Sequence, residues 1–231
     1  MSESDSTDVV PADQNKSNSE PENIRMVALP LADSLGLFPD MVAAGTPTPG
    51  GGSVAAMCGV MASALGQMVC NLTVGKAKFA DREPRVKDIR DELERLGRLL
   101  RELMGEDAES FEAVLRAYRL PKGTEEQKQE RATQVQAATL FAINVPLDTA
   151  RRSFEVLKHL RELADIGNPN ALSDMAVGAA LAQTAIKGAS YNVRVNLGSL
   201  TDKGAAGSIE EQIARLIDES RAIAEEIEAR L

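Results

Sequence analysis

No charged residue occurs between Ser53 and Val74, a stretch of 22 residues in a chain of 231. An uncharged stretch of this length can cross a membrane as a helix. Its residues are mostly Ala and Gly, with polar Ser, Gln and Asn among them, which is a weakly hydrophobic composition for a membrane span. We therefore expect a buried central helix. Small residues recur in it at three- and four-residue spacing, which lets another helix approach closely: Ala55, Gly59, Ala62 and Gly66.

The rest of the chain has helical periodicity, and no run of alternating polar and apolar residues competes with it. Aromatic residues make up only 3% of the chain, which disfavours a β-sandwich or barrel. A second weakly charged helix, rich in Ala and Gly, is expected over Ser173–Leu197. The sequence predicts an all-α fold: a helical bundle with these two Ala/Gly-rich helices at its centre.

Further helices are expected over 31–44, 84–120, 125–144, 146–166 and from about Ile209 onward. Ser53 and Thr124 are placed to cap the helices that follow them. The helix over 84–120 either runs on or bends at Gly105. Pro146 is expected to begin a new helix, because proline favours the first turn. The last helix is either one more helix of the bundle or a helix that forms a short coiled coil with a partner. It contains few heptads, which favours a bundle helix.

The first 25 residues are mostly polar, and their six acids against two basic residues give a charge of −4. Such a segment buries too little apolar surface to fold, so we expect a disordered acidic tail over residues 1–25 and one domain over 26–231. The start of the chain has no apolar signal sequence. We expect a cytoplasmic protein.

The chain carries 26 basic and 35 acidic residues, a formal net charge of −9. This balance and the lack of aromatic residues disfavour nucleic-acid binding. One His and two Cys do not make a zinc cluster. We expect no nucleic-acid partner, no membrane partner, no metal and no protein-bound cofactor.

Three consecutive glycines, Gly50, Gly51 and Gly52, precede Ser53 at the start of the uncharged helix. Glycine lets a backbone approach a ligand closely, and a helix start offers free N–H groups to a negative charge. The alternative is that the three glycines only form a tight turn and bind no ligand. No Lys-Ser/Thr pair follows, so this is not a phosphate-binding Walker A loop.

Polar residues on the two apolar helices form a second candidate set. Four amides and one carboxylate there predict a small-molecule pocket: Asn71, Asn168, Asn192, Asn196 and Asp174. The plain alternative is that each is structural, with Asp174 complementing the helix dipole. Lys76 lies just beyond Asn71 and can hold a carboxylate of an acidic ligand.

Six motifs follow one another along the chain: Thr46-Pro-Thr-Pro-Gly-Gly-Gly-Ser-Val-Ala-Ala56, Met68-Val-Cys-Asn-Leu-Thr-Val-Gly-Lys76, Asp107-Ala-Glu-Ser-Phe111, Gly167-Asn-Pro-Asn170, Ser173-Asp174 and Asn192-Val-Arg-Val-Asn196. In this order they resemble the motifs of the cyclodeaminase/cyclohydrolase family of folate enzymes. The resemblance covers roughly residues 34–202. It implies an all-helical homodimer that binds a tetrahydrofolate derivative near the glycine loop and the subunit interface.

The resemblance also implies an activity, either hydrolysis of 5,10-methenyltetrahydrofolate to 10-formyltetrahydrofolate or cyclodeamination of 5-formiminotetrahydrofolate. A non-catalytic folate-binding dimer is the third possibility. Asp174 is expected to orient or activate the attacking water. The substrate-binding residues implied by the motif matches are Gly50, Gly51, Gly52, Ser53, Asn71, Lys76, Asn168, Asn192 and Asn196. Among them, Lys76 is expected to face the glutamate tail.

Overall fold

The computed structural model describes residues 36–231, and the tail expected over residues 1–25 lies outside this range. The chain divides into two compact units, one ending at Ala44 and one covering Gly45–Leu231. In the first unit, the described part is the short helix α2 (Leu37–Ala43), which includes Pro39. The second unit contains the glycine loop and all the remaining helices.

Throughout residues 36–231 the secondary structure is helical, and no strand occurs there. The second unit consists of five long helices and two short 3₁₀ helices, which confirms the all-α prediction. They are α3 (Gly51–Asn71), η2 (Ala77–Phe79), α4 (Glu83–Tyr118), α5 (Glu125–Ile166), η3 (Pro169–Ala171), α6 (Leu172–Leu197) and α7 (Lys203–Glu228).

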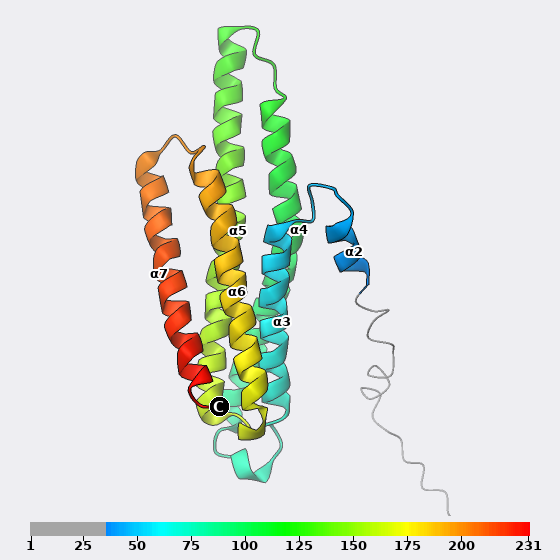
Figure 1. The fold of residues 1–231 in the computed structure, drawn as a ribbon, viewed down its shortest axis with the longest axis vertical. Coiled ribbons are helices and arrows are strands. Elements are labelled where there is room, and N and C mark those ends of the chain that lie inside the picture. The colour runs from blue at the N-terminus through cyan, green and yellow to red at the C-terminus, as the bar shows by residue number, and fades with distance from the viewer. Residues whose placement is uncertain (1–35) are drawn as a thin grey trace, which may run out of the picture. The chain divides into compact units, whose positions relative to one another are not determined.

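Helices α3 and α6 lie side by side (Figure 1). Helix α3 packs on α4 and α5, α6 packs on α5, and α7 packs on α5 and α6. Residues 119–124 join the C-terminal end of α4 to the N-terminal end of α5. These two ends form a hairpin that extends beyond α3 and α6 (Figure 1). The two Ala/Gly-rich helices are therefore neighbours in the bundle. They were expected at its centre, but each has one exposed side in the single chain.

Small residues bring α3 close to its neighbours. A Cβ atom added at Gly59 would lie 2.6 Å from Ser153 Oγ, and one added at Gly66 would lie 2.7 Å from Leu93 Cδ1. Both distances are shorter than van der Waals contact, so an added methyl group at either crossing would force the facing side chain to shift. The predicted small-residue contact surface of α3 is confirmed.

By length and composition α3 could cross a membrane, but 56% of its most apolar window is buried within the bundle. It packs on α4, α5 and α6. These contacts support its assignment as a core helix of the bundle. One side of α3 remains exposed in the single chain, and it carries Val54, Met61 and Met68.

Two predicted helix boundaries are wrong. Pro146 does not begin a helix, because α5 runs through it from Glu125 to Ile166. Ser53 is not the N-cap of α3: the cap position is Gly50, and the helix begins at Gly51. By contrast, Thr124 caps α5 in a reciprocal capping box with Gln127, as predicted.

Candidate active site

A cavity of about 360 Å³ lies where the N-terminus of α3 meets α4, α5 and the C-terminal part of α6. The glycine loop forms one wall. Apolar residues and a few polar groups complete the lining, as is usual for small-molecule sites. The lining residues from the helices are Asp107, Ser110, Phe111, Val114, Ala142, Asn192, Val195 and Asn196.

A carboxylate from another helix caps the first turn of α3. Asp107, on α4, accepts hydrogen bonds through Oδ2 from the backbone N–H of Ser53 at 2.9 Å and from the Ser53 hydroxyl at 3.0 Å. The same hydroxyl lies 3.0 Å from the carbonyl oxygen of Met104. Ser53 is thus fully buried and anchors Asp107, a role that differs from the predicted capping.

Gly52 makes this approach possible. A Cβ atom at Gly52 would lie 2.0 Å from Asp107 Oδ1 and 2.5 Å from its Cγ. Any side chain at this position would displace the carboxylate. Gly52, the third glycine of the loop, therefore leaves the space that the Asp107 carboxylate occupies. A tight turn alone would not require a glycine for this reason.

Burial raises the pKa of Asp107 above its ordinary value, and the hydrogen bonds from Ser53 partly oppose this shift. The carboxyl group thus holds a proton at higher pH than an exposed aspartate. No hydrogen bond from residues 36–231 reaches its second oxygen, Oδ1. A half-buried carboxyl with one oxygen fixed and one available has the properties of a general acid or base.

The two amides of α6 are held by backbone carbonyls. Asn192 Nδ2 donates to Gly188 O at 3.1 Å, while Asn196 Nδ2 donates to Asn192 O at 3.0 Å and to Ala142 O at 3.1 Å. Asn196 thus uses both amide hydrogens on backbone carbonyls and Asn192 uses one of its two. Neither side-chain oxygen accepts a hydrogen bond from residues 36–231, so both oxygens are available as acceptors at the cavity.

The bond from Asn196 to Ala142 depends on Pro146. Proline has no N–H, so the carbonyl four residues earlier, that of Ala142, has no backbone donor within α5. The Asn196 amide supplies the missing hydrogen bond from α6. The proline that was expected to break the helix instead fixes a polar residue of the site.

The other predicted site residues lie at the opposite end of the α3–α6 pair. Asp174 is in the first turn of α6, and the helix rises about 27 Å from there to Asn192. Asn71 ends α3, and Lys76 follows it in an exposed loop. Within one chain, the predicted residues therefore form two clusters instead of a single pocket.

Two of the amides in this second cluster differ from expectation. Asn71 is exposed and not buried. Asn168 is buried and joins the end of α3 to the start of α6: its Nδ2 donates to Leu72 O at 3.2 Å, and its Oδ1 accepts from the Asn170 N–H at 3.1 Å. Its side chain is occupied by these contacts, which indicates a structural role.

Asp107 was missed as a candidate, although a sequence signal exists. Apolar residues of α4 recur at three- and four-residue spacing, and this buried stripe continues through Asp107 and Ser110. A carboxylate and a hydroxyl on the inward side of an amphipathic helix are expected only where other groups can form hydrogen bonds with them.

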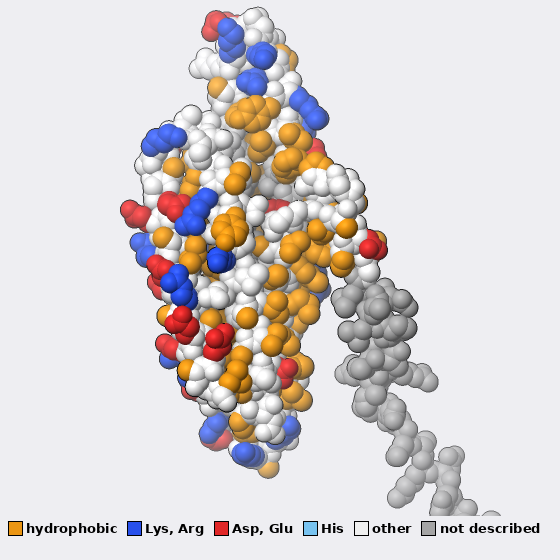
Figure 2. Space-filling view, in the orientation of Figure 1, with side chains coloured by type: hydrophobic (Ala, Val, Ile, Leu, Met, Phe, Trp, Pro, Cys, Tyr) orange, Lys and Arg blue, Asp and Glu red, His pale blue; other side chains and the backbone are white. Residues whose placement is uncertain are grey.

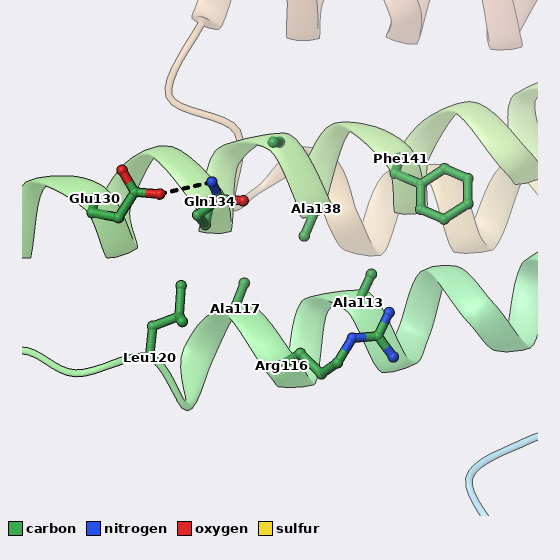
Figure 3. Close-up of a pocket in the computed structure, with 9 residues that line it drawn as sticks. Ala113, Arg116, Ala117, Leu120, Glu130, Gln134, Ala138 and Phe141 are labelled. Carbon is green, nitrogen blue, oxygen red and sulfur yellow. Dashed lines mark hydrogen bonds between the residues drawn. The ribbon is translucent and has the colours of Figure 1, made fainter. Parts of the chain in front are cut away.

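A second cavity of about 530 Å³ lies in the projecting part of the bundle, between α4 and α5 (Figure 3). Four alanines line it, together with Arg116 and a Gln134 amide that donates to Glu130 at 2.8 Å. It contains none of the predicted site residues. Within residues 36–231, no group of three His, Cys, Asp or Glu residues is arranged to hold a metal ion.

Comparison with known proteins identifies relatives over most of the chain. The formiminotransferase-cyclodeaminase family model matches residues 34–215. A methenyltetrahydrofolate cyclohydrolase of Methylorubrum extorquens is 38% identical over 84% of this chain and 94% of its own length. The mouse formimidoyltransferase-cyclodeaminase is 34% identical over 83% of this chain, which spans only 35% of that longer protein.

A solved structure has the same fold. The crystal structure of formiminotetrahydrofolate cyclodeaminase from Thermotoga maritima superimposes with a TM-score of 0.70 at 32% identity, covering 86% of this chain and 94% of the other. The resemblance inferred from the motifs is confirmed by both sequence and structure. The chain belongs to the formiminotransferase-cyclodeaminase family.

Proposed function

We propose that this protein hydrolyses 5,10-methenyltetrahydrofolate to 10-formyltetrahydrofolate in the cavity between the glycine loop and Asp107. The observation that carries the proposal is the half-buried carboxyl of Asp107, held by Ser53 at the N-terminus of α3. The relative from Methylorubrum extorquens, which matches almost end to end, supports this choice of reaction.

The substrate contains a positively charged amidinium carbon that joins two nitrogens. Water adds to this carbon as its proton passes to a base, and the neutral adduct then opens as the bond to N5 breaks. N5 takes up one proton, and the second leaves with the solvent as the C–OH group becomes the formyl C=O. Asp107 Oδ1 is placed to accept the proton from water and return it to N5.

The cavity wall suits the charge and hydrogen-bonding groups of this substrate. The side-chain oxygens of Asn192 and Asn196 are acceptors for the N–H and amino groups of a pterin ring. The N–H groups of Gly51 and Gly52, in the first turn of α3, are donors for an oxygen that gains negative charge. No protein-bound cofactor or metal ion enters this scheme.

Cyclodeamination of 5-formiminotetrahydrofolate is the second candidate. It is supported by the Thermotoga maritima structure, that of a formiminotetrahydrofolate cyclodeaminase, and by the mouse relative, a formimidoyltransferase-cyclodeaminase. In that reaction N10 attacks the formimino carbon and ammonia leaves, so one proton must move to the departing nitrogen. The Asp107 carboxyl can supply this proton. 5,10-Methenyltetrahydrofolate is the product of this reaction and the substrate of the hydrolysis.

We propose further that the protein is a cytoplasmic homodimer. The exposed side of α3 carries Val54, Met61 and Met68, and α6 beside it carries Val177 and Tyr191, each more than a third exposed. Figure 2 shows hydrophobic side chains gathered along α3 on this face. A contiguous apolar surface of this kind marks a protein interface.

A two-substrate assay tests the reaction. Purified protein is incubated separately with methenyl- and formimino-tetrahydrofolate while the methenyl absorbance is followed against buffer blanks. Hydrolysis predicts faster decay of the first compound than in the blank, whereas cyclodeamination predicts a rise with the second. A methenyl absorbance that matches the blank in both samples would contradict both activities. The remaining possibility would then be a protein that binds folate without turnover.

A further inference from the structure

We propose that Ser53 is a positioning residue whose hydroxyl group changes its hydrogen-bond partner when Asp107 gains or loses a proton. The hydroxyl donates to Asp107 Oδ2 when the carboxyl is ionised, and it turns to the carbonyl oxygen of Met104 when the carboxyl is protonated. The inference rests on the proposed function, in which Asp107 accepts and returns a proton. The observation that carries it is the position of one hydroxyl oxygen at equal distance from two acceptors.

The Ser53 hydroxyl has two acceptors and one hydrogen. Its oxygen lies 3.0 Å from Asp107 Oδ2 and 3.0 Å from Met104 O, and both distances fit a hydrogen bond between oxygens. One O–H group donates to only one of these acceptors at a time. The hydroxyl therefore turns to whichever oxygen carries more negative charge, and the charge on Asp107 depends on its protonation.

An ionised carboxylate is the stronger of the two acceptors, because hydrogen bonds to a charged oxygen are about twice as strong as those between neutral groups. The hydroxyl therefore donates to Asp107 Oδ2 in the ionised state. A proton on Asp107 binds at Oδ1, since Oδ2 already accepts from the Ser53 N–H at 2.9 Å. The oxygen of a neutral carboxyl is a weaker acceptor than a peptide carbonyl oxygen, so the hydroxyl then turns to Met104 O.

Neither state leaves a buried polar group without a partner. When the hydroxyl turns to Met104, Asp107 Oδ2 keeps the bond from the Ser53 N–H. When it turns back, Met104 O still faces the N–H four residues later in α4, as carbonyls within a helix do. Ser53 is fully buried, where a hydroxyl without a partner is costly. Rotation of one O–H bond thus accommodates the change of charge without movement of any heavy atom.

Other charged groups do not compensate for the charge of Asp107. Among residues 36–231, it is the one titratable side chain that lines the cavity. The residues of α5 and α6 that face the cavity are neutral: Ala142, Asn192, Val195 and Asn196. Burial raises the pKa of Asp107, and the two hydrogen bonds from Ser53 oppose this rise. The ionised form of Asp107 therefore depends on Ser53.

The proposed reaction changes the charge of this carboxyl twice. Asp107 takes a proton from water and then returns it to N5, so the hydroxyl turns to Met104 after the first transfer and back after the second. The Ser53 N–H holds the carboxyl in place throughout. The N–H bond alone is sufficient to cap α3, and the hydroxyl has the separate role of stabilising the ionised form that begins each turnover.

Stability measurements test this inference without any need for activity. Ser53→Ala keeps the backbone N–H and removes the hydroxyl, so the pKa of Asp107 should rise by about one unit, a tenfold change in the ionisation constant that corresponds to about 1.4 kcal/mol. The unfolding free energy lost through Ser53→Ala should therefore be larger above the folded-state pKa of Asp107 than below it, by about this amount. Urea unfolding of both proteins across this pH range measures the difference.

Two controls identify the cause of the pH dependence. Ser63→Ala removes another fully buried hydroxyl of α3, one that donates to the Leu93 carbonyl oxygen of α4, so its cost should not vary with pH. In an Asp107→Asn background the cost of Ser53→Ala should also become independent of pH. A Ser53→Ala cost that is constant with pH in the native background, or that varies equally in both backgrounds, would overturn the proposal.

The pH profile of turnover tests the same inference in the reaction. Asp107 acts as a base in its ionised form, so the acidic limb of kcat should move about one pH unit higher in Ser53→Ala and stay in place in Ser63→Ala. An unmoved limb in Ser53→Ala, or the same shift in both variants, would overturn the proposal. A wild-type protein that processes neither folate compound would instead overturn the proposed function, and the unfolding measurements would still decide whether the hydroxyl responds to the charge of Asp107.

Discussion

The carboxylate of Asp107 lies at the N-terminus of α3, where Oδ2 accepts hydrogen bonds from the N–H of Ser53 at 2.9 Å and from its hydroxyl at 3.0 Å. One residue on α4 thereby both caps a neighbouring helix and lines the cavity beside the glycine loop. The cap gives the acid a fixed orientation, while partial burial keeps its proton affinity high. The Asp107–Ser53 pair therefore both stabilises the start of α3 and positions the proposed acid–base group.

The raised pKa of Asp107 predicts how stability depends on pH. Because the folded-state pKa lies above the unfolded value of about 3.9, folding binds protons at this group. Its stabilising contribution is fully present below the unfolded-state pKa and is lost as pH rises through the folded-state pKa. Urea unfolding across this range should show the wild type losing stability relative to Asp107→Asn as pH increases. A difference between the two that is constant with pH would contradict the assignment.

Substitution of Gly52 should disable the site. The Gly52→Ala Cβ would lie 2.0 Å from Asp107 Oδ1, so the carboxylate must move. We expect turnover to fall by about 100-fold, the effect of misplacing a reacting group by roughly 1 Å. Gly105→Ala is the matched control, since nothing lies within 4 Å of its added Cβ. It should keep full activity, and similar losses in both variants would refute the steric explanation.

The link between Asn196 and Pro146 predicts a coupled effect on stability. Asn196→Ala leaves the Ala142 carbonyl without its donor, which costs about 1–3 kcal/mol of unfolding free energy. In a Pro146→Ala background the restored backbone N–H can bond to that carbonyl, so the same substitution should cost about 0.5 kcal/mol or less. A double-mutant cycle by urea denaturation measures the difference. Equal costs in the two backgrounds would show that Pro146 does not direct Asn196.

Close packing of α3 makes Gly66 sensitive to a single methyl group. The Gly66→Ala Cβ would lie 2.7 Å from Leu93 Cδ1 and 3.0 Å from Leu160 Cδ2. Overpacking of this kind should reduce the unfolding free energy by about 1–3 kcal/mol. Gly207→Ala on α7, with open space around it, should instead be neutral or more stable by up to about 1 kcal/mol. Thermal or urea unfolding compares the two, and a stable Gly66→Ala protein would contradict the packing.

The sequence was sufficient to predict the all-α bundle, because uncharged small-residue helices and amphipathic stripes leave few other folds. It was misleading at Pro146, where a helix break was expected. The cost of proline within α5 is reduced by an amide from α6, and this long-range hydrogen bond has no local sequence signal. Helix boundaries set by such tertiary contacts cannot be predicted from propensity.

The site was predicted only in part for a related reason. The glycines, Asn192 and Asn196 line one cavity. Asp107 was overlooked because charged residues are frequent on α4, and its place on the buried stripe is the signal that separates it from the others. Asp174 lies in the first turn of α6, far from this cavity, because α6 runs antiparallel to α3 and only its C-terminal part reaches the glycine loop. That direction is set by tertiary packing, which residue spacing alone does not define.

The most direct test of the central claim is the turnover of 5,10-methenyltetrahydrofolate by the wild type and by Asp107→Asn at saturating substrate. We expect a decrease of at least about 100-fold, because proton transfer by a positioned side chain contributes about 10²–10⁴-fold. The variant should remain folded by circular dichroism and should still bind a stable folate analogue. Turnover by Asp107→Asn at the wild-type rate would contradict the account.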